Sequence, residues 1–410
     1  MKQSTSRSRQ HCANCILPAT ALILPPLAVF APLGTAPLLA LSAAALLALD
    51  WQRCRKGFPA LAGLVALLAA LGLWATASTL WSILPYHSLF EGIRLLATSA
   101  GGLVIVSGAL TAAADERRAI GGALIVGVVI ALGFLLIERL THTPMPRFWL
   151  APSSEQHLAL ARFDRGITVL VLALWPTIFA MARPWRRGVF VIAVMAITVI
   201  MSSATAMLAG LLGIGTYAAA RFAPRFVAGA MIVGVLVVAA AIPLATPSYD
   251  TVVALHQNDT WIKPSGIHRL LIWRFGADRV AERPLLGWGM DASREIPGGK
   301  TDFNTMLPAL HYGDRIEAMP LHPHDAALQW QLELGLPGLL LGLGIVIWTL
   351  WQIGWRARRA PDRRAGALAL ASAALAIGLL SFGIWQSWWL STLWLTAALF
   401  TATGTDEQNS

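Results

Sequence analysis

Long apolar stretches separated by short polar segments dominate this chain. The stretches lie at about 16–31, 35–50, 59–80, 93–113, 119–137, 166–182, 188–203, 205–220, 227–246, 324–353, 365–383 and 384–402. A helix needs about 20 apolar residues to cross the hydrocarbon core of a bilayer. Backbone polar groups in lipid must be hydrogen-bonded within the protein, so stretches of this length predict helices. The pattern therefore predicts an all-α, polytopic membrane protein with about 12 transmembrane helices.

Basic residues occupy every second connection between these stretches. By the positive-inside rule, such connections face the cytoplasm, and both termini are then expected to be cytoplasmic. The short connections near 32–34, 204 and 383 carry no Lys or Arg. The basic connections hold 18 of the 31 Lys and Arg, namely Lys2, Arg7, Arg9, Arg53, Arg55, Lys56, Arg117, Arg118, Arg183, Arg186, Arg187, Arg221, Arg225, Arg356, Arg358, Arg359, Arg363 and Arg364.

Composition agrees with a membrane protein and argues against a nucleic-acid partner. Hydrophobic residues make up 56% of the chain and charged residues 13%, about half the charged share of a soluble domain. The net charge of +10 is explained by the cytoplasmic connections rather than by a nucleic-acid surface. Cys12 and Cys15 form a single CxxC with no second pair, so no zinc site is expected. We expect no cleaved signal peptide, because the first apolar run from Ile16 leads straight into further spans.

Two connections are much longer than the rest, at 138–165 and at 247–325. Loops of the second length are usually functional or disordered, and its aromatic residues and helical spacing over 267–281 favour folded structure. The expected organisation is transmembrane helices 1–9 over 1–246, a large periplasmic loop containing short helices and the catalytic site over 247–325, transmembrane helices 10–12 over 326–402, and a cytoplasmic tail over 403–410.

The large loop is unusually basic for the outer side of a membrane. On a helix, Arg269, Arg279 and Arg283 would fall within about 80° of one another. Arg pairs with two phosphate oxygens at once, so one interpretation is an anionic ligand at the membrane surface. The other interpretation is a solvated helix face balanced by acidic neighbours. The eight bases of the loop are Lys263, Arg269, Arg274, Arg279, Arg283, Arg294, Lys300 and Arg315.

The loop ends in His322-Pro323-His324-Asp325, directly before an apolar span. Pro323 suits the first turn of a helix, so His324 is expected at the N-terminal end of the tenth span. The helix dipole and nearby arginines would keep His324 neutral and able to accept a proton. Two other interpretations remain open: His324 merely caps the span, or His322, His324 and Asp325 form a metal site together with His311.

This end of the loop resembles the signature of the O-antigen ligase family. That signature is a His, then Asn, Ser or Gln, then nine residues and GxxG. Here it reads His324, Asp325, nine residues, and Gly335-Leu336-Pro337-Gly338. The upstream stretch HRLLIWRFGADRVAERPLLGWG, over 268–289, is similar to a second segment of the family, an Arg and Trp followed by a PLLGxG turn. Twelve spans and one large periplasmic loop before the tenth also fit.

The resemblance implies a glycosyltransferase of the bacterial inner membrane with its active site in the periplasm. The implied reaction is an inverting, metal-independent transfer that needs no cofactor. The donor would be a glycan on undecaprenyl diphosphate, the acceptor a sugar of the lipid A core, and the surrounding partner membrane lipid. His324 would act as the base, and Arg269 would hold the donor diphosphate, with Arg274 as a further contact. Four residues would support the site: His322, Asp325, Gly335 and Gly338.

Two positions depart from the family pattern. The turn between the seventh and eighth spans reads Ser202-Ser203-Ala204-Thr205, where the family usually presents Ser-Arg. Arg165, at the outer end of the sixth span, is our candidate for the missing diphosphate contact, although it could instead be an interfacial arginine paired with Asp164. Asp325 stands where Asn, Ser or Gln is usual, and its charge would raise the proton affinity of His324.

Other functions share parts of this pattern. An O-antigen polymerase of the same superfamily would use the same donor with a second lipid-linked glycan as acceptor, and a protein O-glycosyltransferase would modify periplasmic protein. A transporter would usually show broken spans and charges near the midplane of the membrane. The nearest candidates for such charges, Glu91 and Arg94, lie close to a periplasmic turn.

Overall fold

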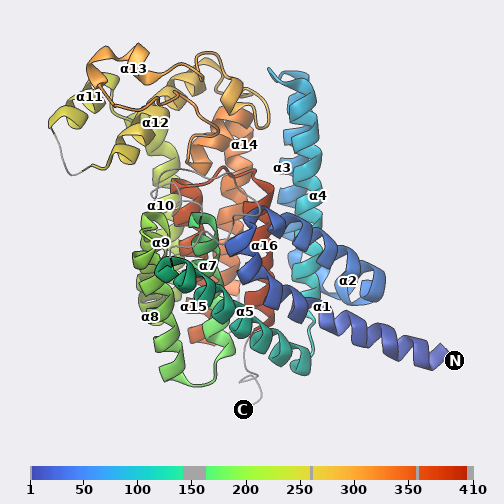
Figure 1. Ribbon diagram of the computed structural model, residues 1–410. Helices are drawn as coiled ribbons and strands as arrows, with labels where there is room; N and C mark the ends of the chain where they lie inside the picture. The colour runs from blue at the N-terminus through green and yellow to red at the C-terminus, as the bar shows by residue number, and fades with distance from the viewer. Residues whose placement is uncertain (1, 142–162, 259–261, 357–359, 404–410) are drawn as a thin grey trace.

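The computed structural model describes residues 2–141, 163–258, 262–356 and 360–403 (Figure 1). Each predicted apolar stretch contains one helix, and no strand occurs within these ranges, so the predicted all-α fold is confirmed. The twelve helices are α1 Lys2–Phe30, α2 Thr35–Gly57, α3 Ala62–Ala77, α4 Pro85–Leu110, α5 Ala114–Thr141, α7 Asp164–Ala180, α8 Pro184–Ile200, α9 Ala204–Ala220, α10 Pro224–Ala245, α14 Ala326–Trp351, α15 Pro361–Leu380 and α16 Ser387–Ala402.

Seven helical segments in the described ranges are long and apolar enough to cross a membrane. One of them, Pro32–Leu80, joins α2 and α3 in a single apolar stretch of 49 residues. The helices α7, α8 and α9 have 17 residues each and α16 has 16, which is shorter than a typical span. The chain is thus a multi-pass helical membrane protein, and the number of twelve spans stays a prediction.

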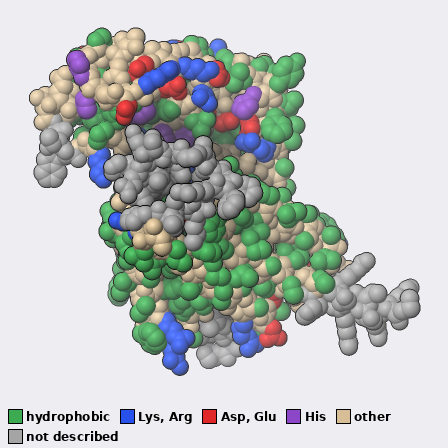
Figure 2. Space-filling model, in the orientation of Figure 1, with side chains coloured by type: hydrophobic (Ala, Val, Ile, Leu, Met, Phe, Trp, Pro, Cys, Tyr) green, Lys and Arg blue, Asp and Glu red, His purple; other side chains and the backbone are tan. Residues whose placement is uncertain are grey.

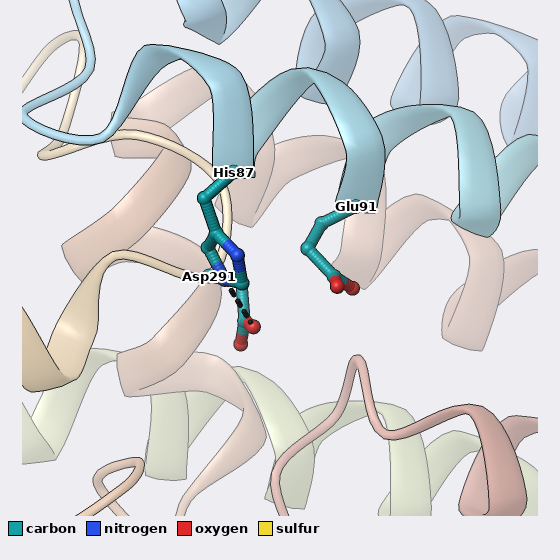
Figure 3. Close-up of side chains that lie close together, drawn as sticks. All are labelled: His87, Glu91 and Asp291. Carbon is teal, nitrogen blue, oxygen red and sulfur yellow. Dashed lines mark hydrogen bonds and ion pairs between the residues drawn. The ribbon is translucent and has the colours of Figure 1, made fainter.

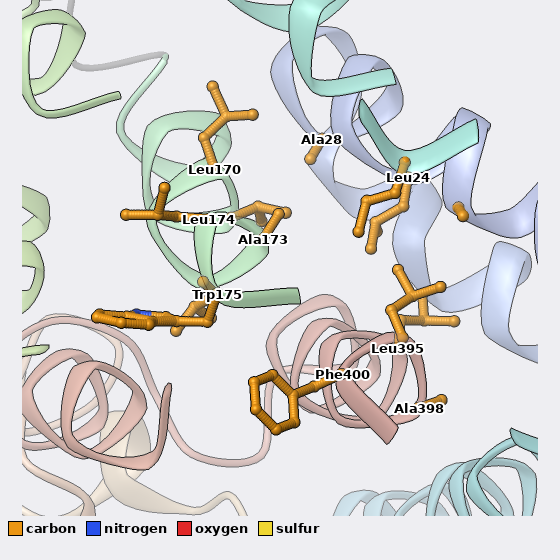
Figure 4. Close-up of a cluster of buried hydrophobic side chains, with 14 of the residues drawn as sticks. Leu24, Ala28, Leu170, Ala173, Leu174, Trp175, Leu395, Ala398 and Phe400 are labelled. Carbon is orange, nitrogen blue, oxygen red and sulfur yellow. The ribbon is translucent and has the colours of Figure 1, made fainter. Parts of the chain in front are cut away.

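The central helix of the bundle is α7, which packs against α1, α5, α8, α9, α15 and α16. Its residues from Gly166 to Phe179 are all buried. Figure 4 shows Leu170 and Trp175 of α7 in the same buried cluster as Leu24 of α1 and Phe400 of α16. Hydrophobic side chains cover a wide band of the visible surface, with Lys and Arg at both ends of the molecule (Figure 2). A buried helix inside a lipid-facing ring explains why α7 needs no polar face.

The large loop folds into a cap over one end of the bundle, above α10 and α14 (Figure 1). It contains α11 Tyr249–Asn258, α12 Pro264–Glu282 and the short α13 Phe303–Met306. The predicted helical segment 267–281 is confirmed as α12. The cap has a hydrophobic core of its own that includes Phe275, Phe303 and Trp288 and extends to Leu332 of α14. The core fixes α12 against the start of α14.

A break in α14 joins the cap to the bundle. Gly335 lies within this helix at φ 65° and ψ −163°, a conformation that is essentially restricted to glycine, and Pro337 follows it. The break leaves the carbonyls of Leu332, Glu333 and Leu334 without helical partners. Three donors from outside the helix satisfy them at 3.0, 2.8 and 2.9 Å, namely the backbone N–H groups of Trp288 and Gly289 and the indole N–H of Trp74.

Candidate functional site

The candidate base His324 lies just before α14, in a left-handed backbone conformation. Helix α14 begins at Ala326, and Asp325 is its N-cap. The expectation that Pro323 occupies the first helical turn is therefore wrong: Pro323 lies outside the helix, and its carbonyl accepts a hydrogen bond of 3.0 Å from the indole of Trp273. His324 has φ +56°, which turns the chain sharply between the loop and the helix.

The ring of His324 is held by one nitrogen and open at the other. Its Nδ1–H donates to the carbonyl of Ser381 at 2.5 Å. In the neutral ring this bond leaves the lone pair on Nε2, which forms no hydrogen bond within the described part of the chain. Burial lowers the pKa of His324 below its ordinary value, and the nearby Arg269 and His268 lower it further. At neutral pH the Nε2 atom is thus free to accept a proton.

His322 has a different environment from His324. The backbone N–H of His324 faces Nδ1 of His322 at 3.2 Å, and that of Gly383 faces Nε2 at 3.1 Å; the single lone pair of the neutral ring can accept from only one of them. Burial lowers the pKa of His322 to about 3, with additional contributions from His324 and Arg165. Because backbone amides face both ring nitrogens, His322 supports the turn at His324 and has no free lone pair for a substrate or a metal.

Asp325 is a helix cap. Its carboxylate accepts a hydrogen bond of 2.7 Å from the backbone N–H of Leu328. Asn and Ser side chains fill the same role at helix N-termini, which explains physically how Asp can replace them here. Burial raises the pKa of Asp325 to about 7, although backbone N–H groups partly offset this rise.

The turn between α15 and α16, residues 381–386, contributes to the site, and the sequence analysis does not predict this. Its Ser381 carbonyl holds His324, and its Gly383 N–H faces His322. A Cβ atom at Gly383 would lie only 2.8 Å from the His322 ring, so this position requires glycine. The apolar pattern predicts two adjoining spans at 365–383 and 384–402. A glycine at their junction was the one available signal that another group approaches this turn closely.

Arg269 of α12 and Arg165 of α7 flank the two histidines. Both are half-buried, and neither forms a hydrogen bond or an ion pair with any other residue that the structure describes. The guanidinium of Arg165 lies over the ring of Trp388, 5.4 Å from its centroid, and the carboxylate of Asp164 hydrogen-bonds Ser203 instead. The positive charge of Arg269 lowers the pKa of His324, and that of Arg165 lowers the pKa of His322. Uncompensated arginines at such a position suit an anionic ligand.

Several other bases of the loop are paired with acidic residues, as the solvated-face interpretation expects. Arg274 forms an ion pair with Asp278, with its Nε 3.3 Å from Oδ2, and Arg279 pairs with Glu282 at 2.5 Å. Arg283 follows the last residue of α12 and stacks over Trp288 at 4.1 Å. Arg274 as a diphosphate contact stays a prediction, and its charge is already balanced.

One group of side chains among the described residues is close enough to hold a metal ion, and it lies at neither of the two histidines. It consists of His87, Glu91 and Asp291, whose ligand atoms lie within 4.8 Å of one another (Figure 3). His87 hydrogen-bonds Asp291 at 3.0 Å, and Glu91 forms an ion pair with Arg94. This hydrogen bond and this ion pair account for the cluster without a metal. Glu91 and Arg94 also pair with each other, which removes them as free charges for a transport pathway.

Comparisons with known proteins support the resemblance to the O-antigen ligase family. The family model described as O-Antigen ligase matches residues 189–343, which include the large loop and the start of α14. Over these residues the chain is similar to the O-antigen ligase family. Proteins named "Putative polysaccharide ligase" from Rickettsia typhi and Rickettsia prowazekii are 28% identical over 326 residues, covering 78% of this chain and 76% of each relative. A protein of the same name from Rickettsia felis is 27% identical over 330 residues.

Both segments that resemble the O-antigen ligase family meet in space. The PLLGWG turn at 284–289 docks on the GxxG segment of α14, and the Leu336 N–H donates to the Pro284 carbonyl at 2.9 Å. A Cβ atom at Gly335 would lie 2.1 Å from the Leu285 carbonyl oxygen, and one at Gly338 would lie 2.2 Å from the Leu334 Cβ. The glycines of the family signature thus permit close packing, and neither offers a side chain for chemistry.

Proposed function

We propose that this protein is an O-antigen ligase, which transfers a glycan from undecaprenyl diphosphate to the lipid A core on the periplasmic face of the bacterial inner membrane. The observation that carries the proposal is the open Nε2 atom of His324, whose Nδ1–H is bonded to Ser381. Arg269 acts on His324 and Arg165 on the adjoining His322, and neither arginine has an ion-pair partner among the described residues. A neutral base beside uncompensated positive charge suits a hydroxyl nucleophile and a diphosphate leaving group.

In the proposed reaction, Nε2 of His324 accepts the proton of an acceptor hydroxyl. The hydroxyl oxygen forms a bond to the anomeric carbon of the donor, and the bond from that carbon to the diphosphate oxygen breaks on the opposite face. The configuration at the anomeric carbon is therefore inverted. The lipid diphosphate itself supplies the activation, so the proposed transfer needs no nucleotide and no metal ion.

Arg269 and Arg165 are proposed to bind the donor diphosphate. Negative charge grows on the bridging oxygen as the bond breaks, and guanidinium groups already in place stabilise it without reorganisation. Both are half-buried, which strengthens their interaction with an anion compared with a fully solvated arginine.

The proposal is tested on lipopolysaccharide from a deletion strain, analysed together with its undecaprenyl-linked glycans. We expect bare lipid A core and long glycans that remain on the lipid carrier. Single repeat units on the core would indicate a polymerase. An unchanged profile would refute both assignments and direct attention to protein glycosylation or transport.

Complementation of this strain tests His324 itself. Asn adopts the left-handed conformation more readily than most residues, so His324→Asn should preserve the turn at φ +56°. We expect this variant to insert normally and to lose transfer by about 100-fold or more, the usual contribution of general base catalysis. The matched control is His311→Asn, which changes an exposed histidine in the same backbone conformation and should complement fully. Full complementation by His324→Asn would rule out His324 as the general base.

A further inference from the structure

A buried carboxylate in α14, Glu333, lies at the centre of a hydrogen-bond network behind His324. Its side chain is fully buried, with 0% of its surface exposed. In the described part of the chain it has no ion-pair partner, and it accepts four hydrogen bonds. The donors are the Asp291 backbone N–H at 2.6 Å, the Trp385 indole at 2.6 Å, the Gln329 amide at 3.0 Å and the Ser293 hydroxyl.

Two of these donors connect Glu333 to the 381–386 turn. Trp385 belongs to the turn, and its indole N–H donates directly to Oε2 of Glu333. Gln329 donates to Oε1 of Glu333 through its amide nitrogen, while its amide oxygen accepts from the backbone N–H of Ile384 at 2.9 Å. Glu333 therefore determines which way the amide of Gln329 points, since its NH₂ group must face the carboxylate.

The opposite side of the same turn holds the two histidines. Ser381 accepts from Nδ1 of His324, and the Gly383 N–H faces Nε2 of His322. Residues 381–385 thus contact the histidines on one side and the Glu333–Gln329 pair on the other. A shift of this short turn would change the length and angle of the bond between His324 and Ser381.

We propose that Glu333 is a positioning residue for His324: through Gln329 and Trp385 it fixes the 381–386 turn, and so sets the tautomer and orientation of the catalytic ring. The inference rests on the proposed function of His324. It adds a residue that is not part of the histidine and GxxG signature and that does not reach the substrate itself. All four partners of Glu333 donate hydrogen, so an amide at this position would place N–H groups against a donor.

The first test is Glu333→Gln, which keeps the shape of the side chain and removes two acceptor sites. We expect kcat to fall by about 10- to 100-fold, because buried donors left without an acceptor would displace the turn that holds His324. KM for the donor should be nearly unchanged. The matched control is Glu282→Gln, which changes an exposed carboxylate of α12 that pairs with Arg279. This control should retain wild-type kinetics.

A pH profile separates positioning from general destabilisation. The hydrogen bond to Ser381 raises the pKa of His324, whereas burial, Arg269 and His268 lower it. His322 adjoins the ring but is itself held neutral by burial. If Glu333→Gln loosens the bond to Ser381, the acid limb of kcat against pH should move to lower pH. A purely structural defect would lower activity without moving this limb.

Two further measurements keep the inference testable if Glu333→Gln does not fold. Trp385→Phe removes a single donor from the network and should shift the acid limb in the same direction by a smaller amount. The rate of carbethoxylation of His324 by diethyl pyrocarbonate, followed by mass spectrometry against pH, reports the pKa of the ring without any glycan transfer. An unchanged pH profile and an unchanged carbethoxylation profile in both variants would overturn the inference.

These outcomes distinguish the failure of the inference from that of the proposed function. Full glycan transfer by His324→Asn would refute the proposed role of His324, regardless of the result for the Glu333 variant. Loss of transfer in His324→Asn, combined with wild-type kinetics in Glu333→Gln, would leave the base in place and reject only the positioning role.

Discussion

At the scale of the residue, charge pairing divides the arginines of the large loop into two kinds. Arg274 and Arg279 are paired with carboxylates one helical turn away, whereas Arg269 has no acidic partner among the described residues. The charge pattern of the sequence does not separate these three arginines. The unpaired charge of Arg269 beside His324 makes it the stronger candidate for a diphosphate contact.

Substitution of lysine tests this difference. Arg269→Lys preserves the charge but not the forked geometry, so we expect transfer to fall by about 10-fold or more, with most of the loss in donor binding. Arg279→Lys is the matched control and should remain near wild type, because its partner Glu282 accepts an ammonium as well. Equal activity of the two variants would argue against diphosphate binding by Arg269.

The raised pKa of Asp325 predicts that the folding stability of the protein depends on pH. Its folded-state pKa of about 7 lies above the ordinary value of 3.8, so ionisation is less favourable in the folded state than in the unfolded state. Below pH 3.8 the carboxyl group is neutral in both states, and its full contribution to the free energy of unfolding is present. This contribution is lost as the pH rises through 7, where the group must ionise in the folded state. Asp325→Asn keeps an oxygen to cap Leu328 without this cost.

We therefore expect Asp325→Asn to be more stable than wild type above pH 7, by about 1–3 kcal/mol, and to approach wild type in acid. Thermal unfolding in detergent at several pH values measures this difference. Asp325→Ala, which removes the cap altogether, is the comparison and should be less stable than Asp325→Asn at every pH. A stability difference that does not change with pH would contradict the assignment of a raised pKa.

At the scale of the element, the break in α14 determines how the cap sits on the bundle. Pro337 and Gly335 interrupt the helix, and the PLLGWG turn supplies the backbone donors for its free carbonyls. Two sequence segments about fifty residues apart thereby form one structural unit. Glu333, two residues before the break, lies in the same unit and reaches the 381–386 turn.

Gly335→Ala should disrupt the packing of the PLLGWG turn against the break in α14. The new Cβ would face the Leu285 carbonyl in a backbone conformation that alanine avoids, and we expect a loss of stability of about 2–4 kcal/mol. Gly234→Ala is the control, since a Cβ there meets nothing within 4 Å in α10, and it should be neutral or slightly stabilising. Similar unfolding midpoints for the two variants would show that the break tolerates a side chain.

At the scale of the whole molecule, the cap and the arginine-rich connections lie at opposite ends of the helical bundle (Figures 1 and 2). The proposed reaction requires the cap to face the periplasm, because the lipid-linked donor is used there. The charge distribution of the connections predicts the same orientation.

Labelling with a membrane-impermeant thiol reagent tests the orientation. Cys12 and Cys15 are exposed and would be changed to serine, whereas Cys54 is buried and can remain. A cysteine in place of Asp314, exposed in the cap, should react in intact spheroplasts. A cysteine in place of Phe222, exposed between α9 and α10, should react only after lysis. The reverse pattern would place the proposed site in the cytoplasm.

The sequence by itself determined the helical membrane fold, because bilayer-length apolar stretches allow little else. It also made His324 and Arg269 candidates, since the motifs that contain them are local in the chain. The tertiary structure decided what depends on contacts between distant segments: the bond from His324 to Ser381, the backbone partners of His322, and the pairing that separates Arg274 from Arg269. The apolar pattern could not indicate a role for Glu333, a carboxylate inside an apolar span. Its proposed positioning role depends on four hydrogen-bond donors that only the tertiary structure shows.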